Sequence, residues 1–405
     1  MSAQTARPAM TLDTLPETTD DARAGAAYRL RPHPPLRVQV DEQPDLQALE
    51  PEWRALQAQA EASPFTRWNW VGTWWHQLPA AQRPWLLRVD DGAQTVGMGL
   101  LGRRTMRRLR VWPSRALLLH AVGLPECDDL TIEHNGWLAR RGYEDEVDGA
   151  ALTALLHRRP GADQVILPGL ARMPAWPAPD GLQDGTVVRR WTQPAFRVDL
   201  QPVRAAGKPY LETIGARTRS SIRRSLRLYE TLGPVAVEAA SDPDQALDFL
   251  ARLEHLHQAT WQSRGQPGAF ANPRFGAFHR AFVAKGYVDG EVQMLRLRAG
   301  ERDIGLLYNL VGPQGVISYQ SGFDYRLLDI NHHPGLVTHA LAVQRALEDG
   351  HAHYDLLAGE SRYKEQLATA RYEMSTVSVH RAGAVLALEQ AWQRWAGRWR
   401  SRSGG

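Results

Sequence analysis

Short runs of alternating apolar and polar residues follow one another along the first half of the chain, separated by longer runs with helical spacing. Within residues 44–61, for example, Leu49, Trp53 and Leu56 recur on one helical face. The Asp-Asp-Gly sequence at 90–92 is typical of a hairpin turn between two strands. The elements expected in this half are a strand at 36–40, helices at 44–61 and 66–78, strands at 85–90, 94–101 and 116–122, a helix at 144–158 and a strand at 164–167.

The second half repeats this order of elements, although no residue-level repeat is visible. Its expected elements are a helix at 209–231, a strand at 235–239, helices at 243–263 and 273–285, strands at 291–298, 303–311 and 315–322, a helix at 335–348, a strand at 353–357 and a last helix at 384–400. The pattern predicts an α+β fold with two lobes, each a mixed, mostly antiparallel sheet flanked by helices. We expect a disordered leader at 1–35, lobes at 36–200 and 201–382, and a basic, Trp-rich helix and tail at 383–405.

The composition is that of a globular protein. The chain has 405 residues, of which 43% are hydrophobic and 23% charged, and no apolar run approaches the ~18 residues of a membrane span. The first 35 residues lack the pattern of a secretory signal, so we expect a cytoplasmic protein. Cys127 is the only cysteine, which excludes an intrachain disulfide and a thiolate zinc cluster, and no metal site is expected.

Charge is informative only locally, because a net charge of +4 is too small to indicate nucleic-acid binding. Arginines crowd the expected helix at 209–231, and Arg219, Arg223 and Arg227 fall four residues apart, on one stripe. Guanidinium groups without interleaved carboxylates favour an anionic partner such as a phosphate group. A solvated helix face with its counter-charges elsewhere in the fold explains the same pattern equally well.

A glycine-rich sequence at 97–102 matches GxGxxG, but no full helix follows it, so we interpret it as an inner strand that uses glycine for close packing. A second glycine lies at a helix start, where His333, Pro334 and Gly335 precede an apolar helix. Free N–H groups at such a start can bind an anion, although a plain helix entry fits too. Two aromatic-rich strand ends, at 318–324 and 354–364, bracket this entry.

Residues 205–380 resemble the GNAT-like acetyltransferase domain of the family associated with cellulose biosynthesis, which is related to the FemAB-like peptidoglycan bridge transferases. The features that match are the arginine-rich helix at 217–227, the strand end at 319–324, Pro334-Gly335 and the segment 355–364. The Trp-rich segment 63–75 is similar to the first half of that family. The resemblance implies two GNAT-like lobes in tandem. The acyl-CoA-binding pattern [QR]xxGxG/A of ordinary GNAT enzymes does not stand before the helix at 335–348.

The resemblance also implies an acyl transfer that uses acetyl-CoA or another acyl-CoA as co-substrate, with no bound cofactor. The acceptor would be an amine or hydroxyl in exopolysaccharide or cell-envelope biosynthesis. The expected roles are donor-phosphate binding by Pro334, Gly335, Lys364, Arg219 and Arg223, protonation of the leaving thiolate by Tyr363, base catalysis by Asp324 or Glu360, and acceptor binding by Tyr319 and Asp355.

Two alternatives to acyl-CoA transfer stay open. One is a FemAB-like transfer that takes its acyl group from aminoacyl-tRNA. The other is a non-catalytic protein that binds a polysaccharide-synthesis assembly, a membrane surface or another protein through the C-terminal helix. Its Trp392, Trp395 and Trp399 lie at helical spacing among arginines, although such a helix can equally pack on its own domain.

Overall fold

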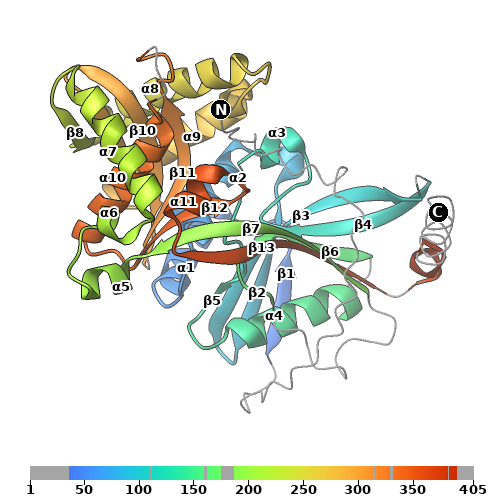
Figure 1. Ribbon diagram of the computed structural model, residues 1–405. Helices are drawn as coiled ribbons and strands as arrows, with labels where there is room; N and C mark the ends of the chain where they lie inside the picture. Colours follow the sequence, from blue (N-terminus) through green and yellow to red (C-terminus); the bar gives the residue numbers. More distant parts are fainter. Residues whose placement is uncertain are drawn as a thin grey trace, which may run out of the picture. The chain divides into compact units, whose positions relative to one another are not determined.

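The computed structural model describes residues 36–109, 111–130, 132–158, 162–174, 187–313, 315–328, 332–381 and 383–389. The chain divides into two compact units (Figure 1). Unit 1 comprises Ala62–Gln77 and Gln193–Met374, and unit 2 comprises, within the described residues, 36–61, 78–192 and 375–389. The leader at 1–35 and the tryptophans of the expected C-terminal helix lie outside the described residues.

Unit 2 holds a mixed sheet with the strand order β1-β2-β3-β4-β6-β13, in which only β4 and β6 run parallel. Its elements are β1 (Arg37–Asp41), α1 (Leu46–Gln57), β2 (Trp85–Asp91), β3 (Gln94–Arg108), β4 (Trp112–Leu119), α3 (Pro125–Asp128), β5 (Leu138–Ala139), α4 (Glu144–Thr153), β6 (Gln164–Leu170) and the end of β13 (Ala370–His380). The glycines of the GxGxxG sequence lie in β3. A Cβ on Gly102 would stand 1.9 Å from the Ala121 carbonyl oxygen, so close packing explains that glycine.

In unit 1 the strands follow the order β7-β12-β11-β10-β9-β8, and among the described residues here only β11 and β12 run parallel. Its elements are α2 (Trp68–Gln77), the end of β7 (Val187–Asp199), α5 (Leu200–Ala205), α6 (Tyr210–Thr213), α7 (Ala216–Glu230), β8 (Val235–Ala239), α8 (Pro243–Gln262), α9 (Pro273–Val288), β9 (Val292–Ala299), β10 (Arg302–Val311), β11 (Gly315–Phe323), α10 (Pro334–Glu348), β12 (His353–Ala358) and α11 (Arg362–Leu367). The expected α+β fold, with mixed and mostly antiparallel strands flanked by helices, is confirmed. The single helix expected at 209–231 is wrong, because extended backbone at Ile214 separates α6 from α7.

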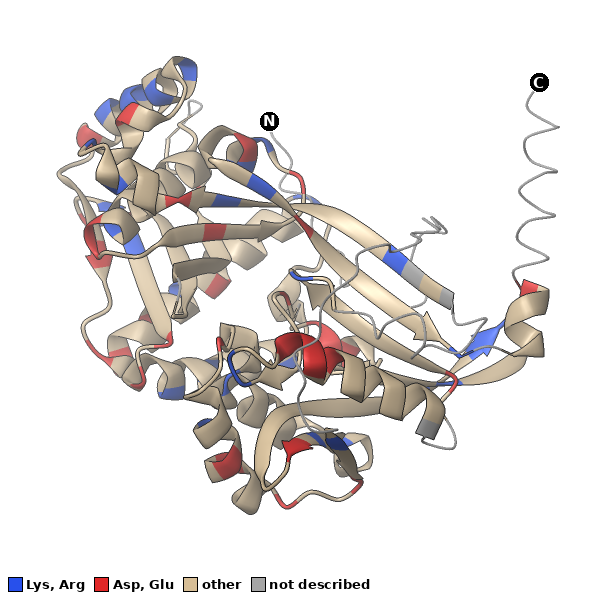
Figure 2. Ribbon diagram, turned by 90° about the horizontal axis from the view of Figure 1, so that it is seen from below, with Lys and Arg blue, Asp and Glu red and all other residues tan. Residues whose placement is uncertain are grey.

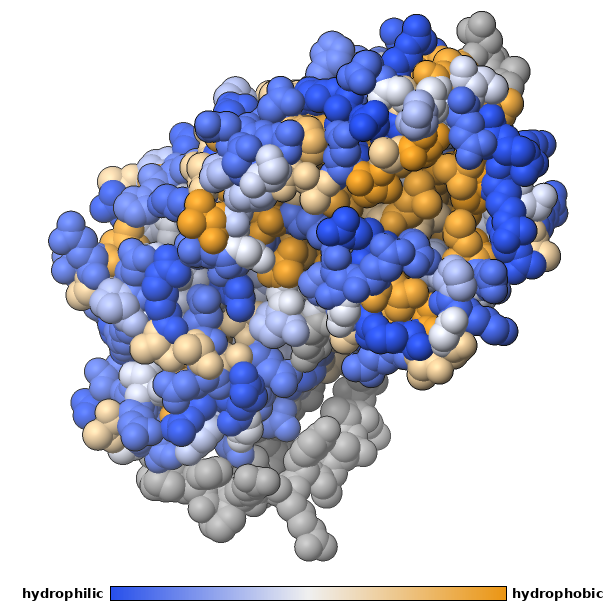
Figure 3. Space-filling view, turned by 90° about the vertical axis from the view of Figure 1, so that its left-hand side faces the viewer, coloured by the Kyte–Doolittle hydropathy of each residue, from blue (hydrophilic) through white to orange (hydrophobic). Residues whose placement is uncertain are grey.

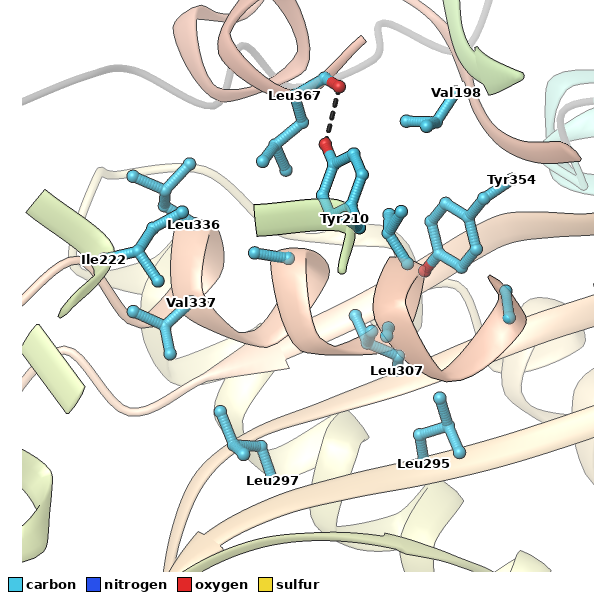
Figure 4. Packing of buried hydrophobic residues seen from close by; sticks show 14 of the residues in the cluster. Val198, Tyr210, Ile222, Leu295, Leu297, Leu307, Leu336, Val337, Tyr354 and Leu367 are labelled. Carbon is cyan, nitrogen blue, oxygen red and sulfur yellow. Dashed lines mark hydrogen bonds between the residues drawn. The ribbon is translucent and has the colours of Figure 1, made fainter. Parts of the chain in front are cut away.

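The main core of unit 1 lies between the sheet and the helices α6, α7 and α10 (Figure 4). Leu295, Leu297 and Leu307 project from the strands toward Val337 of α10. The hydroxyl of Tyr210 donates a 2.6 Å hydrogen bond to the Leu367 carbonyl, so this buried polar group has a partner.

On the opposite face of this sheet, α2 packs against α9, although α2 comes from the first half of the chain. The Trp70 ring makes edge contacts with Phe278, Phe282 and Tyr319, at centroid distances of 4.8, 5.1 and 5.5 Å. Asn69 donates hydrogen bonds to the Asp289 and Glu291 carboxylates. The compact units therefore differ from the contiguous lobes expected at 36–200 and 201–382.

Candidate functional site

The parallel strands β11 and β12 separate part of the way along their length. Their hydrogen-bonded ladder covers Gly315–Ile317 of β11 and His353–Asp355 of β12. Beyond it, β11 stays paired with β10 and β12 stays paired with β7, but the register between β11 and β12 ends. We call the region between their C-terminal ends the β11–β12 gap.

Backbone irregularities on both strands mark the start of the gap. In the β10–β11 pairing, Tyr308 opposes Gln320 and Asn309 opposes Ser318, so Tyr319 is an extra, bulged residue. The β7–β12 register shifts between Asp355 and Leu357, and Leu357 has a positive φ of 62°. Bulges bend strands, which accounts for the separation at this level of the sheet.

The N-terminus of α10 begins above the end of β11. His333 precedes the helix with a φ of 44°, and Pro334 occupies the first helical turn, where it needs no N–H. A Cβ on Gly335 would lie 3.2 Å from the Phe323 ring, so glycine allows the helix to approach the strand end. Burial, Arg224 of α7 and Arg362 of α11 lower the pKa of His333, which places two cationic side chains near this helix start.

Three aromatic rings line up from the end of β11 to α11. The Tyr363 ring stacks on His339 of α10 with a centroid distance of 4.8 Å and an interplanar angle of 11°. The Phe323 ring contacts the His339 ring edge-on, with a centroid distance of 5.7 Å. Tyr363, expected from the sequence, and the helix start at Pro334 and Gly335 therefore lie around the same gap.

His339 was not predicted from the sequence. Its side chain is 1% exposed, and both ring nitrogens are buried without a hydrogen-bond partner among the described residues. Burial, assisted by the Lys364 ammonium, lowers the pKa of His339 to about 3. A lone histidine between the apolar Val337 and Ala340 of this helix was the signal that could have identified it.

Lys364 lies at this site, but its charge is directed inward. Its ammonium donates hydrogen bonds to the carbonyls of Leu357 and Ala358, at 3.2 and 2.6 Å. The side chain is 6% exposed, so it fastens α11 to the end of β12.

The two candidate bases lie in different surroundings. Asp324 follows β11 and is partly buried, where its backbone N–H bonds Ile304 and its carbonyl contacts the His332 ring. Burial raises the pKa of the Tyr229 phenol, and the nearby Asp324 carboxylate raises it further. Glu360 lies on the surface with 71% of its side chain exposed, 4.0 Å from Arg371.

The two residues expected to bind the acceptor are packed inside the unit. Tyr319 is 4% exposed among the rings around α9, and its hydroxyl lies 3.2 Å from His279 Nε2. Asp355 is 2% exposed and accepts hydrogen bonds from the Tyr372 hydroxyl and the Leu357 N–H. The structure thus places both side chains away from the three-ring cluster.

The arginines of α7 follow the helix along its exposed side (Figure 2). Arg223 is exposed, and Arg219 donates to the Glu212 carbonyl. Within the described residues, Arg217, Arg223 and Arg227 make no ion pair. Figure 3 shows that apolar side chains line a hollow with a hydrophilic rim on the left-hand side of the molecule in Figure 1.

Unit 2 has a parallel pair of its own, β4 and β6, but residues 132–137 lie beside both strands where their ladder ends. Asn135 donates from its side chain to the Leu119 carbonyl at the end of β4. Its backbone N–H donates to Gly169 of β6, where a Cβ would stand 2.0 Å from the Ile132 oxygen. The place that corresponds to the β11–β12 gap is therefore filled by the chain itself.

Comparisons with known proteins agree with this description. Residues 216–365 match the family model of the acetyltransferase (GNAT) domain, so the chain carries a GNAT acyltransferase domain in unit 1. The structure of FemX aligns with a TM-score of 0.52 and 11% identity over 84% of this chain and 96% of that chain, which shows a shared fold. The C-terminal domain of a putative lysylphosphatidylglycerol synthetase from Agrobacterium fabrum aligns with a TM-score of 0.49 and 12% identity over 86% and 96%. The search of curated proteins found no match.

Proposed function

We propose that the chain transfers an acyl group from an acyl-CoA, acetyl-CoA in the first instance, to an amine or hydroxyl acceptor. The observation that carries the proposal is the β11–β12 gap, which has a helix N-terminus at its entrance and Tyr363 at its side. The GNAT domain match over residues 216–365 supports it. For the acceptor, we propose a sugar or lipid precursor of the cell envelope, reached from the cytoplasm.

The donor would enter the gap with its phosphates at the start of α10. Free N–H groups and the helix dipole favour an anion there, with Pro334 and Gly335 as the first helical residues. Arg224 and Arg362 add positive charge at the same place, and Arg219 and Arg223 continue it along α7. Lys364 would act indirectly, because its ammonium holds the backbone carbonyls of Leu357 and Ala358 at the end of β12.

The acyl carbon would then lie beside Tyr363. The acceptor attacks the thioester carbonyl, the C–S bond breaks, and Tyr363 protonates the leaving thiolate. Asp324 would receive the acceptor's proton through water, and its partly buried position at the end of β11 supports this role. Glu360 is the weaker candidate for this role, because 71% of its side chain is exposed to solvent.

Calorimetric titration with CoA and acetyl-CoA tests the donor site. We expect saturable binding by the wild type, and Arg224→Gln or Arg362→Gln should each weaken it about 2- to 5-fold, as expected for one partly screened charge. Arg302→Gln removes an exposed arginine from the β9–β10 turn and is the matched control, with unchanged affinity expected. A folded wild type that binds neither ligand at millimolar concentration would exclude acyl-CoA as donor.

Aminoacyl-tRNA is the second candidate donor, favoured by the exposed α7 arginines that lack carboxylate partners among the described residues. Binding of charged tRNA should then weaken steeply with salt, because each phosphate contact releases counterions. Arg217→Gln and Arg227→Gln would reduce that salt dependence. The same variants should leave acetyl-CoA binding unchanged if acyl-CoA is the donor.

A further inference from the structure

His339 occupies a central position beside the gap. It projects from the buried face of α10, one ring face covered by Tyr363 and its side met by Phe323 of β11. These three residues come from the three elements that surround the separated strand ends. Because the centroids of the Tyr363 and His339 rings are 4.8 Å apart, a group that contacts Tyr363 within the gap comes close to His339.

Packing alone does not explain a histidine here. Both of its ring nitrogens are buried and have no hydrogen-bond partner among the described residues. A buried polar group without a hydrogen-bond partner destabilises the fold, whereas a phenylalanine would fill the same stack without that cost. The side chain therefore keeps a donor and an acceptor that the protein does not use internally, at the place where the proposed substrates meet.

The ionisation state limits what this ring can do. Burial, with a smaller effect from the Lys364 ammonium, lowers the pKa of His339 to about 3, so the imidazole stays neutral at physiological pH. Such a weak base cannot take a proton from an ammonium group efficiently. A neutral imidazole still has one N–H, and an N–H held in a buried site is an effective donor to an oxyanion.

We propose that His339 is a further catalytic residue of the acyl transfer, whose N–H donates a hydrogen bond to the thioester carbonyl oxygen. The inference rests on the proposed function. When the acceptor's lone pair attacks, the C=O π electrons move to this oxygen and His339 stabilises the negative charge. The C=O bond then re-forms, the C–S bond breaks, and the thiolate receives its proton from Tyr363, which regains one through solvent from Asp324, the group that received the acceptor's proton. The half-buried Tyr363 ring must admit the acyl group at the imidazole edge.

The infrared band of acetyl-CoA labelled with ¹³C at the carbonyl provides a test that needs no acceptor. We expect the band of the bound donor to lie at lower frequency than that of free acetyl-CoA in the wild type. His339→Phe keeps the aromatic stack but should abolish this shift, and His339→Gln, which retains an N–H donor, should restore part of it. CoA affinity and thermal stability should be unchanged in His339→Phe, or stability should rise.

Turnover gives the second measurement, followed as thiol release from acetyl-CoA with water as acceptor. Loss of one oxyanion donor should lower kcat about 10²- to 10³-fold in His339→Phe, with little change in KM. A bound donor with the same carbonyl band in the wild type and His339→Phe would overturn this inference and leave the proposed function standing. A wild type that binds no acetyl-CoA would remove both.

Discussion

At the residue scale, burial separates structural ionisable groups from candidates for chemistry. Lys364 and Asp355 have their charged atoms bonded to groups inside unit 1, so we assign them to holding β12 and its bulge. Tyr363 is half-buried beside the gap, and Asp324 is partly buried at the end of β11. Only such intermediate positions combine access to a substrate with a restrained geometry.

Tyr363→Phe tests the assignment of the acid. Because the stack on His339 uses only the ring, the variant should fold and bind CoA like the wild type. Loss of the proton donor should reduce kcat about 10²- to 10⁴-fold. Tyr287→Phe, which removes a hydroxyl bonded to Ala240 at a different part of the unit, should leave kcat unchanged. Equal turnover in Tyr363→Phe and the wild type would remove this phenol from the mechanism.

The buried His279 should make the free energy of unfolding depend on pH. Burial lowers its pKa to about 3, while its ring contacts the hydroxyls of Tyr308 and Tyr319. The folded-state pKa of His279 lies below the unfolded value near 6.5. The contribution of the neutral His279 to the free energy of unfolding is therefore complete above pH 6.5 and is lost as pH falls toward 3.

From pH 7 to 5, His279 alone should remove about 2 kcal/mol from the free energy of unfolding. Asp128, whose pKa burial raises to about 6, acts in the opposite direction over part of this range. Urea unfolding of the wild type and His279→Gln at both pH values separates the two, because the variant keeps Asp128. An identical pH dependence in both proteins would contradict the assignment.

The sequence could predict those parts of the candidate site that have a local sequence signature. It could not predict the parts that depend on strand pairing or tertiary packing. Pro334-Gly335 and Tyr363, which border the gap, were predicted because helix starts and strand ends have local signatures. Tyr319 and Asp355 lie in the same predicted strand ends, but side-chain direction within a strand depends on bulges that the sequence does not mark. His339 was missed for a similar reason, since only tertiary packing shows that its nitrogens lack partners.

At the element scale, α2 shows how far pairing can depart from chain order. The Trp-rich helix was predicted at 66–78, and the structure has it at Trp68–Gln77, yet it packs in unit 1 instead of with its sequence neighbours. Periodicity fixes the existence of such a helix, whereas its partner is determined by long-range contacts such as Asn69 with Glu291.

Trp70→Ala measures the contribution of α2 to unit 1. The side chain is 1% exposed and contacts five rings, so its removal should lower the free energy of unfolding by about 3–5 kcal/mol. Trp112→Ala, at a residue that is 44% exposed in β4, should change it by less than about 0.5 kcal/mol. Equal effects of the two substitutions in urea unfolding would show that α2 does not pack as described.

At the scale of the whole molecule, the two units differ in what lies between their parallel strands. No helix among the described residues is long and apolar enough to cross a membrane. In unit 1 the C-terminal ends of β11 and β12 are separated. In unit 2 Asn135 donates hydrogen bonds to the carbonyls of Leu119, at the end of β4, and of Gly169, in β6. Because residues 132–137 occupy this position and Asn135 satisfies the Leu119 and Gly169 carbonyls, the described part of unit 2 has no comparable place for a ligand.

The expected stoichiometry of donor binding is therefore about one acetyl-CoA per chain, although each unit has a parallel strand pair of the same kind. Opening unit 2 for a second donor would break the Asn135 bonds to Leu119 and Gly169 and expose buried polar groups, each costing about 1–3 kcal/mol. Arg224→Gln/Arg362→Gln should weaken all of the measured binding, because every bound donor would lie at α10. A titration that saturates at two donors, with one insensitive to these substitutions, would show that residues 132–137 leave the β4–β6 interval and that both sheets bind donor.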